Sequence, residues 1–262
     1  MRKTDQRLKI TFLGTGTSQG IPVIGSKHPV CLSPDPRDKR LRVSVMVEPG
    51  DGRVYVIDCG PDFRQQMLRH DVQRLDGILF THEHADHTAG IDDIRPFFFR
   101  QGDIPIFAHP RVVDSLRKRF DYIFADENRY PGAPAVAVHT VEKGTSFRLG
   151  SNWVVPIDAR HNRLQVFGYR IGDFAYLTDA KTVEPEERQR LEGVEVLVVN
   201  ALRQEAHHSH FNLEEALEFI RMVKPARAYL THISHTMGFH AEVEAGLPEN
   251  VHLAYDDLTI TL

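Results

Sequence analysis

Short apolar segments that end at a histidine or an aspartate recur along the 262-residue sequence. The polar residues that follow these segments are His82, His161, Asp179 and His232. In layered α/β folds the ends of neighbouring strands lie at one edge of a sheet, and ligands bind at that edge. The pattern therefore predicts several strands whose ends bring these four side chains together.

The rest of the chain also has the pattern of short strands with interspersed helices. Pro49-Gly50-Asp51-Gly52 separates two apolar runs, 43–47 and 54–57, which predicts a β-hairpin. Apolar residues recur at helical spacing within 213–220 and predict a helix that ends before Pro225. Strands and helices in both halves predict two mixed sheets covered by helices, a layered α/β sandwich.

The composition excludes several classes of protein. With 41% apolar and 26% charged residues and no internal repeat or long linker, the chain is expected to form one globular domain over 1–262. Two cysteines, Cys31 and Cys59, are too few for a disulfide framework and indicate a reducing compartment, so we expect a cytoplasmic protein. No stretch approaches the roughly 20 apolar residues of a membrane span, and none follows the charged N-terminus as a signal peptide would require. The 32 basic and 36 acidic residues give a net charge of −4, which argues against a protein that wraps nucleic acid.

The densest chemical signal is the segment Thr81-His82-Glu83-His84-Ala85-Asp86-His87. Imidazole and carboxylate together form the ligand set of Zn, Mn and Fe. His82 and His84 are two residues apart, so an extended strand end directs both to one side. Asp86 and His87 follow the turn and can face a second ion. A solvated histidine-rich loop is the alternative, and the density of ligands disfavours it.

The residues after the other strands supply the further ligands that a two-metal site needs. His161, Asp179 and His232 each follow an apolar strand, and the carboxylate of Asp179 can bridge two cations. Taken singly, each would be interpreted as a turn or surface residue. Their joint order favours a two-metal site.

Together these motifs resemble the metallo-β-lactamase superfamily, as do Leu13–Ser18 and Ile57–Gly60. The resemblance implies an α/β fold, a four-layer αββα sandwich of two mixed sheets, with two divalent metal ions, Zn or Mn, at one edge. It assigns one ion to His82, His84 and His161, the other ion to Asp86, His87 and His232, and the bridging position to Asp179. It also assigns Asp58 to the orientation of a ligand histidine; a turn-forming aspartate before Gly60 is the alternative.

Within the superfamily, the chain resembles the phosphodiesterase branch. Gly14–Ser18, Gln19–Pro22, Ser209–Leu213 and Thr231–His235 are similar to tRNase Z-type enzymes and, more closely, to PhnP-like phosphoribosyl cyclic phosphodiesterases. The resemblance implies hydrolysis of a small cyclic or nucleotide-like phosphodiester by a hydroxide held between the two metal ions. His210 and Asp86 are the catalytic candidates, with His210 as the proton donor to the leaving ribose oxygen. A place in the exposed run His207–His210 is the alternative for His210.

One motif departs from the family pattern. PhnP-like proteins carry a structural zinc on a C-x-C-x2-C run and a later histidine, where this chain has Ser26, His28, Cys31 and His235. Three ligands, His28, Cys31 and His235, are one short of a closed zinc site. An additional structural Zn completed by water is one interpretation, and a vestigial site is the other.

Several other functions use parts of the same pattern. A tRNA 3′-processing endonuclease is the first alternative, although the charge balance makes a nucleic-acid partner less favoured than a small phosphodiester. A thioester or lactam hydrolase would leave His210 without a task, and a diiron redox enzyme usually has Glu at the position of His84. A non-enzymatic metal-binding protein is disfavoured by the complete ligand set. No membrane partner is expected, and Phe97-Phe98-Phe99 suggests a homodimer contact as one alternative to lining the site.

Overall fold

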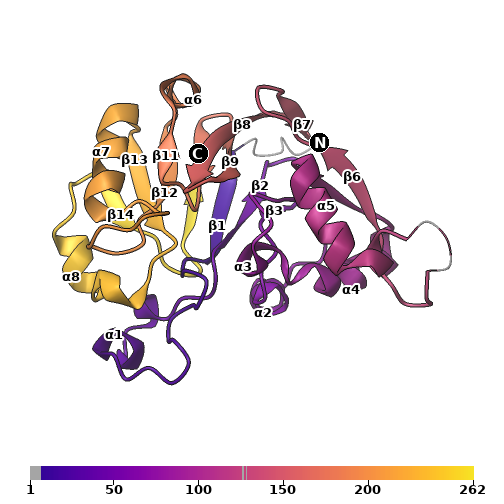
Figure 1. Cartoon of the computed structure of the whole chain (residues 1–262), viewed down its shortest axis with the longest axis horizontal. Helices are drawn as coiled ribbons and strands as arrows, with labels where there is room; N and C mark the ends of the chain where they lie inside the picture. Colours follow the sequence, from indigo (N-terminus) through magenta and orange to yellow (C-terminus); the bar gives the residue numbers. More distant parts are fainter. Residues whose placement is uncertain (1–6, 126, 128) are drawn as a thin grey trace.

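The structure is a computed structural model that describes residues 7–125, 127 and 129–262. Residues 1–6, on which the prediction about a signal peptide partly rests, lie outside the described residues. Two mixed β-sheets face each other, with helices on their outer sides (Figure 1). The predicted layered α/β sandwich is therefore confirmed.

The first sheet has the strand order β15-β1-β2-β3-β4-β5-β6. Its strands are β1 (Lys9–Gly14), β2 (Ser44–Glu48), β3 (Tyr55–Ile57), β4 (Gly77–Leu79), β5 (Ile104–Ala108), β6 (Val136–Thr140) and β15 (Thr259–Thr261). The second sheet has the order β11-β8-β9-β10-β12-β13-β14, with β7 paired to β8. Its strands are β7 (Phe147–Leu149), β8 (Asn152–His161), β9 (Leu164–Ile171), β10 (Phe174–Leu177), β11 (Thr182–Val183), β12 (Val196–Asn200), β13 (Arg227–Thr231) and β14 (Val251–Leu253).

The helices form the outer layers. On the first sheet lie α2 (Phe63–Arg69), α4 (Arg95–Gln101) and α5 (Pro110–Arg119), and on the second α6 (Pro185–Gln189), α7 (Leu213–Val223) and α8 (His240–Ala245) (Figure 1). The short helices α1 (Pro29–Leu32) and α3 (Ala85–Thr88) and the 3-10 turns Pro36–Asp38, Ile91–Ile94, Asp121–Ile123 and His235–Met237 lie in the connections. No helix within the described ranges is long and apolar enough to span a bilayer.

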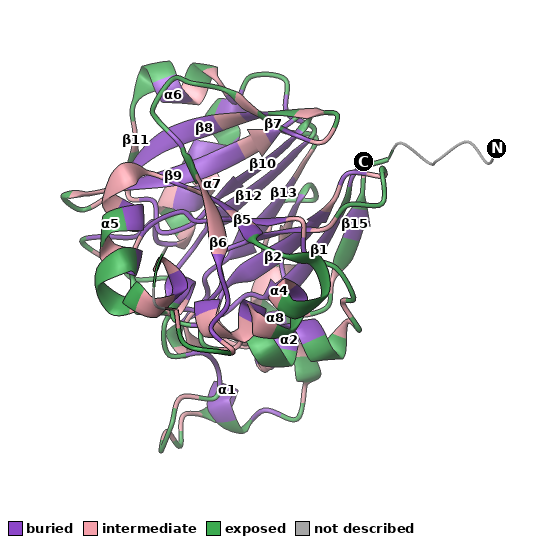
Figure 2. Ribbon diagram, turned by 90° about the vertical axis from the view of Figure 1, so that its right-hand side faces the viewer, coloured by how far each residue is buried: buried purple, intermediate pink, exposed green. Residues whose placement is uncertain are grey.

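Three apolar clusters hold the layers together. The cluster between the sheets contains Phe12 and Tyr169, the cluster under α2, α4 and α5 contains Phe63, and the cluster under α7 contains Leu177 and Ile220. Figure 2 shows the central strands of both sheets buried, whereas the edge strands β6 and β15 and the outer faces of the helices are partly exposed. Each burial removes apolar surface from water, so the two sheets are held at a fixed separation.

The predicted elements occur with small changes. The hairpin is β2–β3, an antiparallel pair, and α7 ends at Val223 with Lys224 in the left-handed region before Pro225. His161 was expected to follow a strand, but β8 continues to His161, because the β8–β9 ladder pairs His161 with Leu164. His161 is therefore the last residue of a strand rather than part of the following loop.

The connection between β1 and β2 projects from the sandwich and carries α1 (Figure 1). We call residues 20–39 the arm. The buried guanidinium of Arg40 anchors its base, because it donates to the Thr15 hydroxyl at 2.8 Å and to the carbonyl of Ala254. In contrast to the buried Arg40, Ile24 on the arm is 96% exposed.

The aromatic run behind the homodimer alternative divides between inside and outside. Phe97 is buried in the cluster under the first-sheet helices, whereas Phe99 is exposed. The homodimer stays a prediction.

Candidate metal centre

The seven predicted ligand residues meet where the strands of both sheets end. His82, His84, Asp86 and His87 lie between β4 and the end of α3. His161 ends β8, Asp179 follows β10 and His232 follows β13. Ligand atoms of three overlapping groups lie within 4.8 Å of one another: His82, His87 and Asp179; His84, His161 and Asp179; Asp86, His87 and His232. We call the seven residues the cluster.

Asp179 lies between the two halves of the cluster. Its Oδ2 is 3.7 Å from Nε2 of His82, while its Oδ1 is 3.5 Å from Nε2 of His87 and 3.0 Å from Nε2 of His232. The Oδ2 of Asp86 is 3.3 Å from Nε2 of His87 and 3.9 Å from Nε2 of His232. The two oxygens of Asp179 thus face different sets of imidazoles, which is the arrangement that a bridging carboxylate requires.

Neighbouring groups determine which nitrogen of each ring carries the hydrogen. Asp58 accepts at both oxygens, from the Thr81 N–H and hydroxyl at 2.8 Å each and from Nδ1 of His87 at 2.7 Å. Because the Thr81 hydroxyl donates to Asp58, it accepts from Nδ1 of His82 at 3.0 Å. Nδ1 of His161 likewise donates to the carbonyl of Ser209 at 2.8 Å. When the three rings are neutral, their lone pairs are therefore on Nε2.

The residues present fit a divalent cation. Nε2 of His82 and Nε2 of His87 are buried without a hydrogen-bond partner. Leaving such atoms unpaired is costly unless a ligand satisfies them. Buried imidazole lone pairs beside carboxylates are the donor set of Zn and Mn.

The charges inside the cluster are strongly coupled. Burial raises the pKa of Asp179, but the charges of His232 and His87 outweigh burial and hold that pKa well below its usual range. Burial lowers the pKa of His87, but Asp179, Asp58 and Asp86 outweigh it and hold that pKa well above its usual range. Without a cation, protons take its place between these carboxylates and imidazoles, so metal binding releases protons.

His210 lies against the cluster and is not part of an exposed run. It is 8% exposed, and its ring centroid is 4.4 Å from that of His161 and 4.9 Å from that of His232. Burial and the charge of His232 lower the pKa of His210 to about 2. The prediction of His210 as a proton donor assumed an ordinary pKa, and its role in catalysis stays a prediction.

Sequence reasoning missed several features that shape the site. Asp58, Asp179 and His232 have φ between 54° and 65°, in the left-handed region that costs roughly 1–2 kcal/mol per non-glycine residue. A Cβ at Gly60 would lie 2.0 Å from the carbonyl oxygen of Asp86, so only glycine permits this close approach. The glycine at position 60, two residues after Asp58, could have indicated this close approach from the sequence. Nothing in the sequence predicts the strained dihedral angles.

The predicted structural zinc residues are only partly brought together. The rings of His28 and His235 are 4.9 Å apart, but His28, Cys31 and His235 do not form a group with ligand atoms within 4.8 Å of one another. Nδ1 of His28 accepts from the N–H of Val30 at 3.3 Å and caps α1, which places the ring hydrogen on Nε2. Cys31 packs in a small apolar cluster with Val30.

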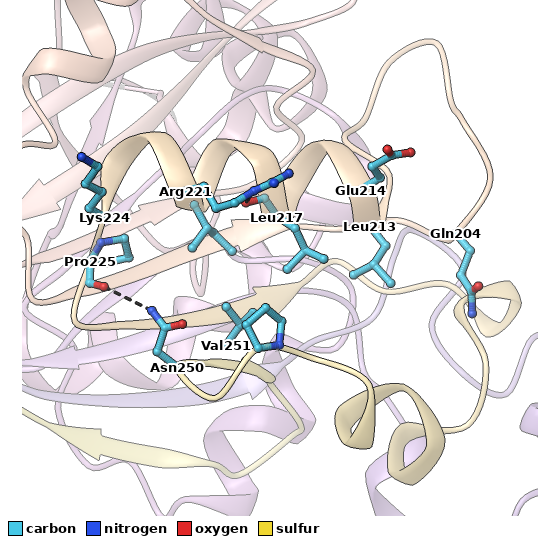
Figure 3. Close-up of a pocket in the computed structure, with 11 residues that line it drawn as sticks. Gln204, Leu213, Glu214, Leu217, Arg221, Lys224, Pro225, Asn250 and Val251 are labelled. Atoms are coloured by element: carbon cyan, nitrogen blue, oxygen red, sulfur yellow. Dashed lines mark hydrogen bonds between the residues drawn. The ribbon is translucent and has the colours of Figure 1, made fainter.

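A separate groove runs along α7. It encloses about 730 Å³ and is lined on its apolar side by Leu213, Leu217, Ile220 and Val251 (Figure 3). None of the cluster residues lines it. The groove is therefore distinct from the candidate metal centre.

The fold and the cluster define a metallo-β-lactamase-type protein, and sequence comparison agrees. The Beta-lactamase superfamily domain matches residues 53–233, and this chain belongs to that superfamily. An octanoyltransferase of Porphyromonas gingivalis is 38% identical over 252 residues, which cover 96% of this chain and 51% of the relative. A ribonuclease Z of Cyanothece sp. is 26% identical over 174 residues, covering 63% of this chain and 47% of the relative. The chain thus spans about half the length of these curated relatives.

Solved structures extend the similarity to the whole chain. A structure described as a new diphosphatase from the PhnP family superposes with a TM-score of 0.90 at 36% identity, covering 97% of both chains. Zn(2+)-bound PqqB from Methylobacterium extorquens superposes with a TM-score of 0.79 at 18% identity, covering 97% of this chain and 100% of that chain. The second similarity concerns the fold alone.

Proposed function

We propose that this protein is a metal-dependent hydrolase that cleaves a small cyclic or nucleotide-like phosphodiester. The supporting observation is the position of Asp179, whose two oxygens face two different sets of imidazoles. The names of two similar proteins, a diphosphatase and a ribonuclease Z, refer to cleavage of phosphate linkages. The octanoyltransferase name belongs to a relative about twice as long, so it does not assign acyl transfer to the matched half.

Two divalent cations, Zn or Mn, would be held by the cluster. One would bind His82, His84 and His161, the other Asp86, His87 and His232, and both Asp179. When bound, such a pair lowers the pKa of water and neutralises charge on a phosphoryl oxygen.

The side chains of this chain prepare and complete the reaction. Asp58 and the Ser209 carbonyl fix imidazole orientations before substrate arrives. The carboxylate of Asp86 is 15% exposed, compared with 3% for Asp179, so Asp86 is the more accessible of the two and is the one we assign to accept a hydrogen bond from the attacking water. His210, packed against His161 and His232, donates a hydrogen bond to the leaving oxygen.

Parallel assays test the assignment. Protein loaded with Zn or Mn is given bis(p-nitrophenyl) phosphate, an octanoyl thioester and a short RNA with a 3′ trailer. We expect the phosphodiester to be hydrolysed with the highest kcat/KM. Preference for the thioester would overturn the phosphodiester assignment, and preference for the RNA would favour the tRNA-processing alternative. His210→Ala should retain its metal and lose most turnover on esters with a poor leaving group.

A further inference from the structure

A second imidazole lies on the outer side of His210. The connection between β12 and α7 carries His207 and His208, and the centroid of the His207 ring is 5.2 Å from that of His210. His207 is half-buried, whereas His210 is buried. The rings of His232, His210 and His207 thus follow one another from the buried cluster to a half-buried side chain.

Ser209 gives His207 the opposite tautomer to the cluster histidines. Nδ1 of His207 lies 3.3 Å from the N–H of Ser209, which donates to it, so the ring hydrogen is on Nε2. The carbonyl of the same Ser209 accepts from Nδ1 of His161, whose Nε2 keeps its lone pair. One residue thus turns a lone pair of His161 toward the cluster and leaves His207 with a free N–H donor.

Basic side chains lie near His207, but carboxylates pair with them. Besides burial, the groups that lower its pKa are His208, Arg203, His161 and Lys181. Glu205 and Glu215 pair with Arg203 and Lys181, whereas His207 has no carboxylate partner among the described residues. A free N–H donor without a carboxylate partner is suited to an anionic oxygen.

We propose that His207 binds a second phosphoryl group of the substrate, adjacent to the one that is cleaved, and so selects diphosphate-linked esters. This inference rests on the proposed metal-dependent hydrolysis at phosphorus, and the bond that breaks here is the anhydride between two phosphoryl groups rather than a phosphodiester. The oxygen of water bonds to phosphorus, and the bond from that phosphorus to the bridging oxygen breaks. The bridging oxygen leaves with the electron pair on the second phosphoryl group, whose other oxygens accept from Nε2 of His207. Both products are phosphomonoesters.

A matched pair of substrates tests this selectivity. The metal-loaded protein is assayed with diadenosine 5′,5″-diphosphate and with the dinucleoside monophosphate ApA, which lacks the second phosphoryl group. We expect the wild type to prefer the diphosphate. His207→Ala should reduce the ratio of the two kcat/KM values by about 10- to 100-fold, as expected for a hydrogen bond to a charged group. The loss should be in KM, and His207→Gln, which keeps an N–H donor, should recover part of the ratio.

The control is His70→Ala, a histidine that pairs with Asp257 and not with His207 or His210; it should keep the wild-type ratio. Equal losses on both substrates in His207→Ala, or a wild type without preference for the diphosphate, would overturn the inference while leaving phosphodiester hydrolysis intact. Failure to cleave either substrate or bis(p-nitrophenyl) phosphate would instead overturn the proposed function.

Discussion

The cluster and the arm both contain residue types that bind metal, but they differ in what the second nitrogen of each imidazole does. In the cluster, Nδ1 of His82, His87 and His161 donates to a hydroxyl, a carboxylate or a carbonyl, so Nε2 is free to bind a cation. In the arm, Nδ1 of His28 accepts from a backbone N–H, so the hydrogen is on Nε2. Residue type alone does not distinguish these regions; the partner of the second nitrogen does.

The two regions also differ in how firmly the surrounding structure holds their side chains. The cluster lies where strands of both sheets end, above three apolar clusters that fix the sheets. The arm projects outward, and its contacts with the sandwich include those of Arg40 and the Asp38 carboxylate, which accepts from the N–H of His240. A ligand position on packed strands is held more accurately than one on a projecting loop.

The largest effect is expected from Asp179→Ala. This change removes the carboxylate that faces both halves of the cluster, and several kcal/mol of charge stabilisation correspond to a loss of about a thousandfold in turnover. Elemental analysis of the purified variant should show less bound metal than the wild type. Full metal content together with full activity would contradict the bridging role.

A smaller effect is expected from Asp58→Asn, which replaces an acceptor oxygen shared by His87 and Thr81. Loss of such an orienting partner typically weakens metal binding by about 10- to 100-fold, and competition with a chelator measures this loss. Asp62→Asn is the control, because Asp62 pairs with Arg42 and contacts no cluster residue. If both variants bind metal equally well, Asp58 does not orient the ligand.

Arg111→Ala tests whether the cluster depends on contact between the two sheets. On α5, Arg111 donates to the side chain of Glu83 and, at 2.6 Å, to the carbonyl of Gln165 on β9. Gln165 follows Leu164, the residue that pairs with His161 in the β8–β9 ladder. We expect metal binding to weaken by about threefold to tenfold, the size of coupling carried through packed networks. Arg117→Ala on the same helix, where Arg117 only covers the Phe124 ring, should bind as the wild type does. If Arg111→Ala and Arg117→Ala bind metal with equal affinity, metal binding does not depend on the contact that Arg111 makes between the two sheets.

The sequence predicted the layers and the convergence of the seven residues because apolar strands and the residues that follow them are local features. His82 and Asp179 are examples, since each follows a recognisable strand. The contributions of Thr81 and the Ser209 carbonyl were not predictable, because they depend on backbone positions set by tertiary packing. The lowered pKa of His210 was missed for the same reason: burial of a side chain beside His232 is not encoded in local spacing.

The smallest effect on metal content is expected from changes in the arm and at His235, whose ring lies beside that of His28. Cys31→Ser puts a hydroxyl into the small apolar cluster with Val30, which costs about 1–3 kcal/mol if the hydroxyl finds no partner, so Tm should fall. Because His28 carries its hydrogen on Nε2, this fall should be the same with and without a chelator, and the zinc content should equal that of the wild type. His235→Ala should likewise retain the wild-type zinc content. A loss of about one zinc per chain in both variants would show that the arm binds metal, and the partner of the second nitrogen would then not decide between the two regions.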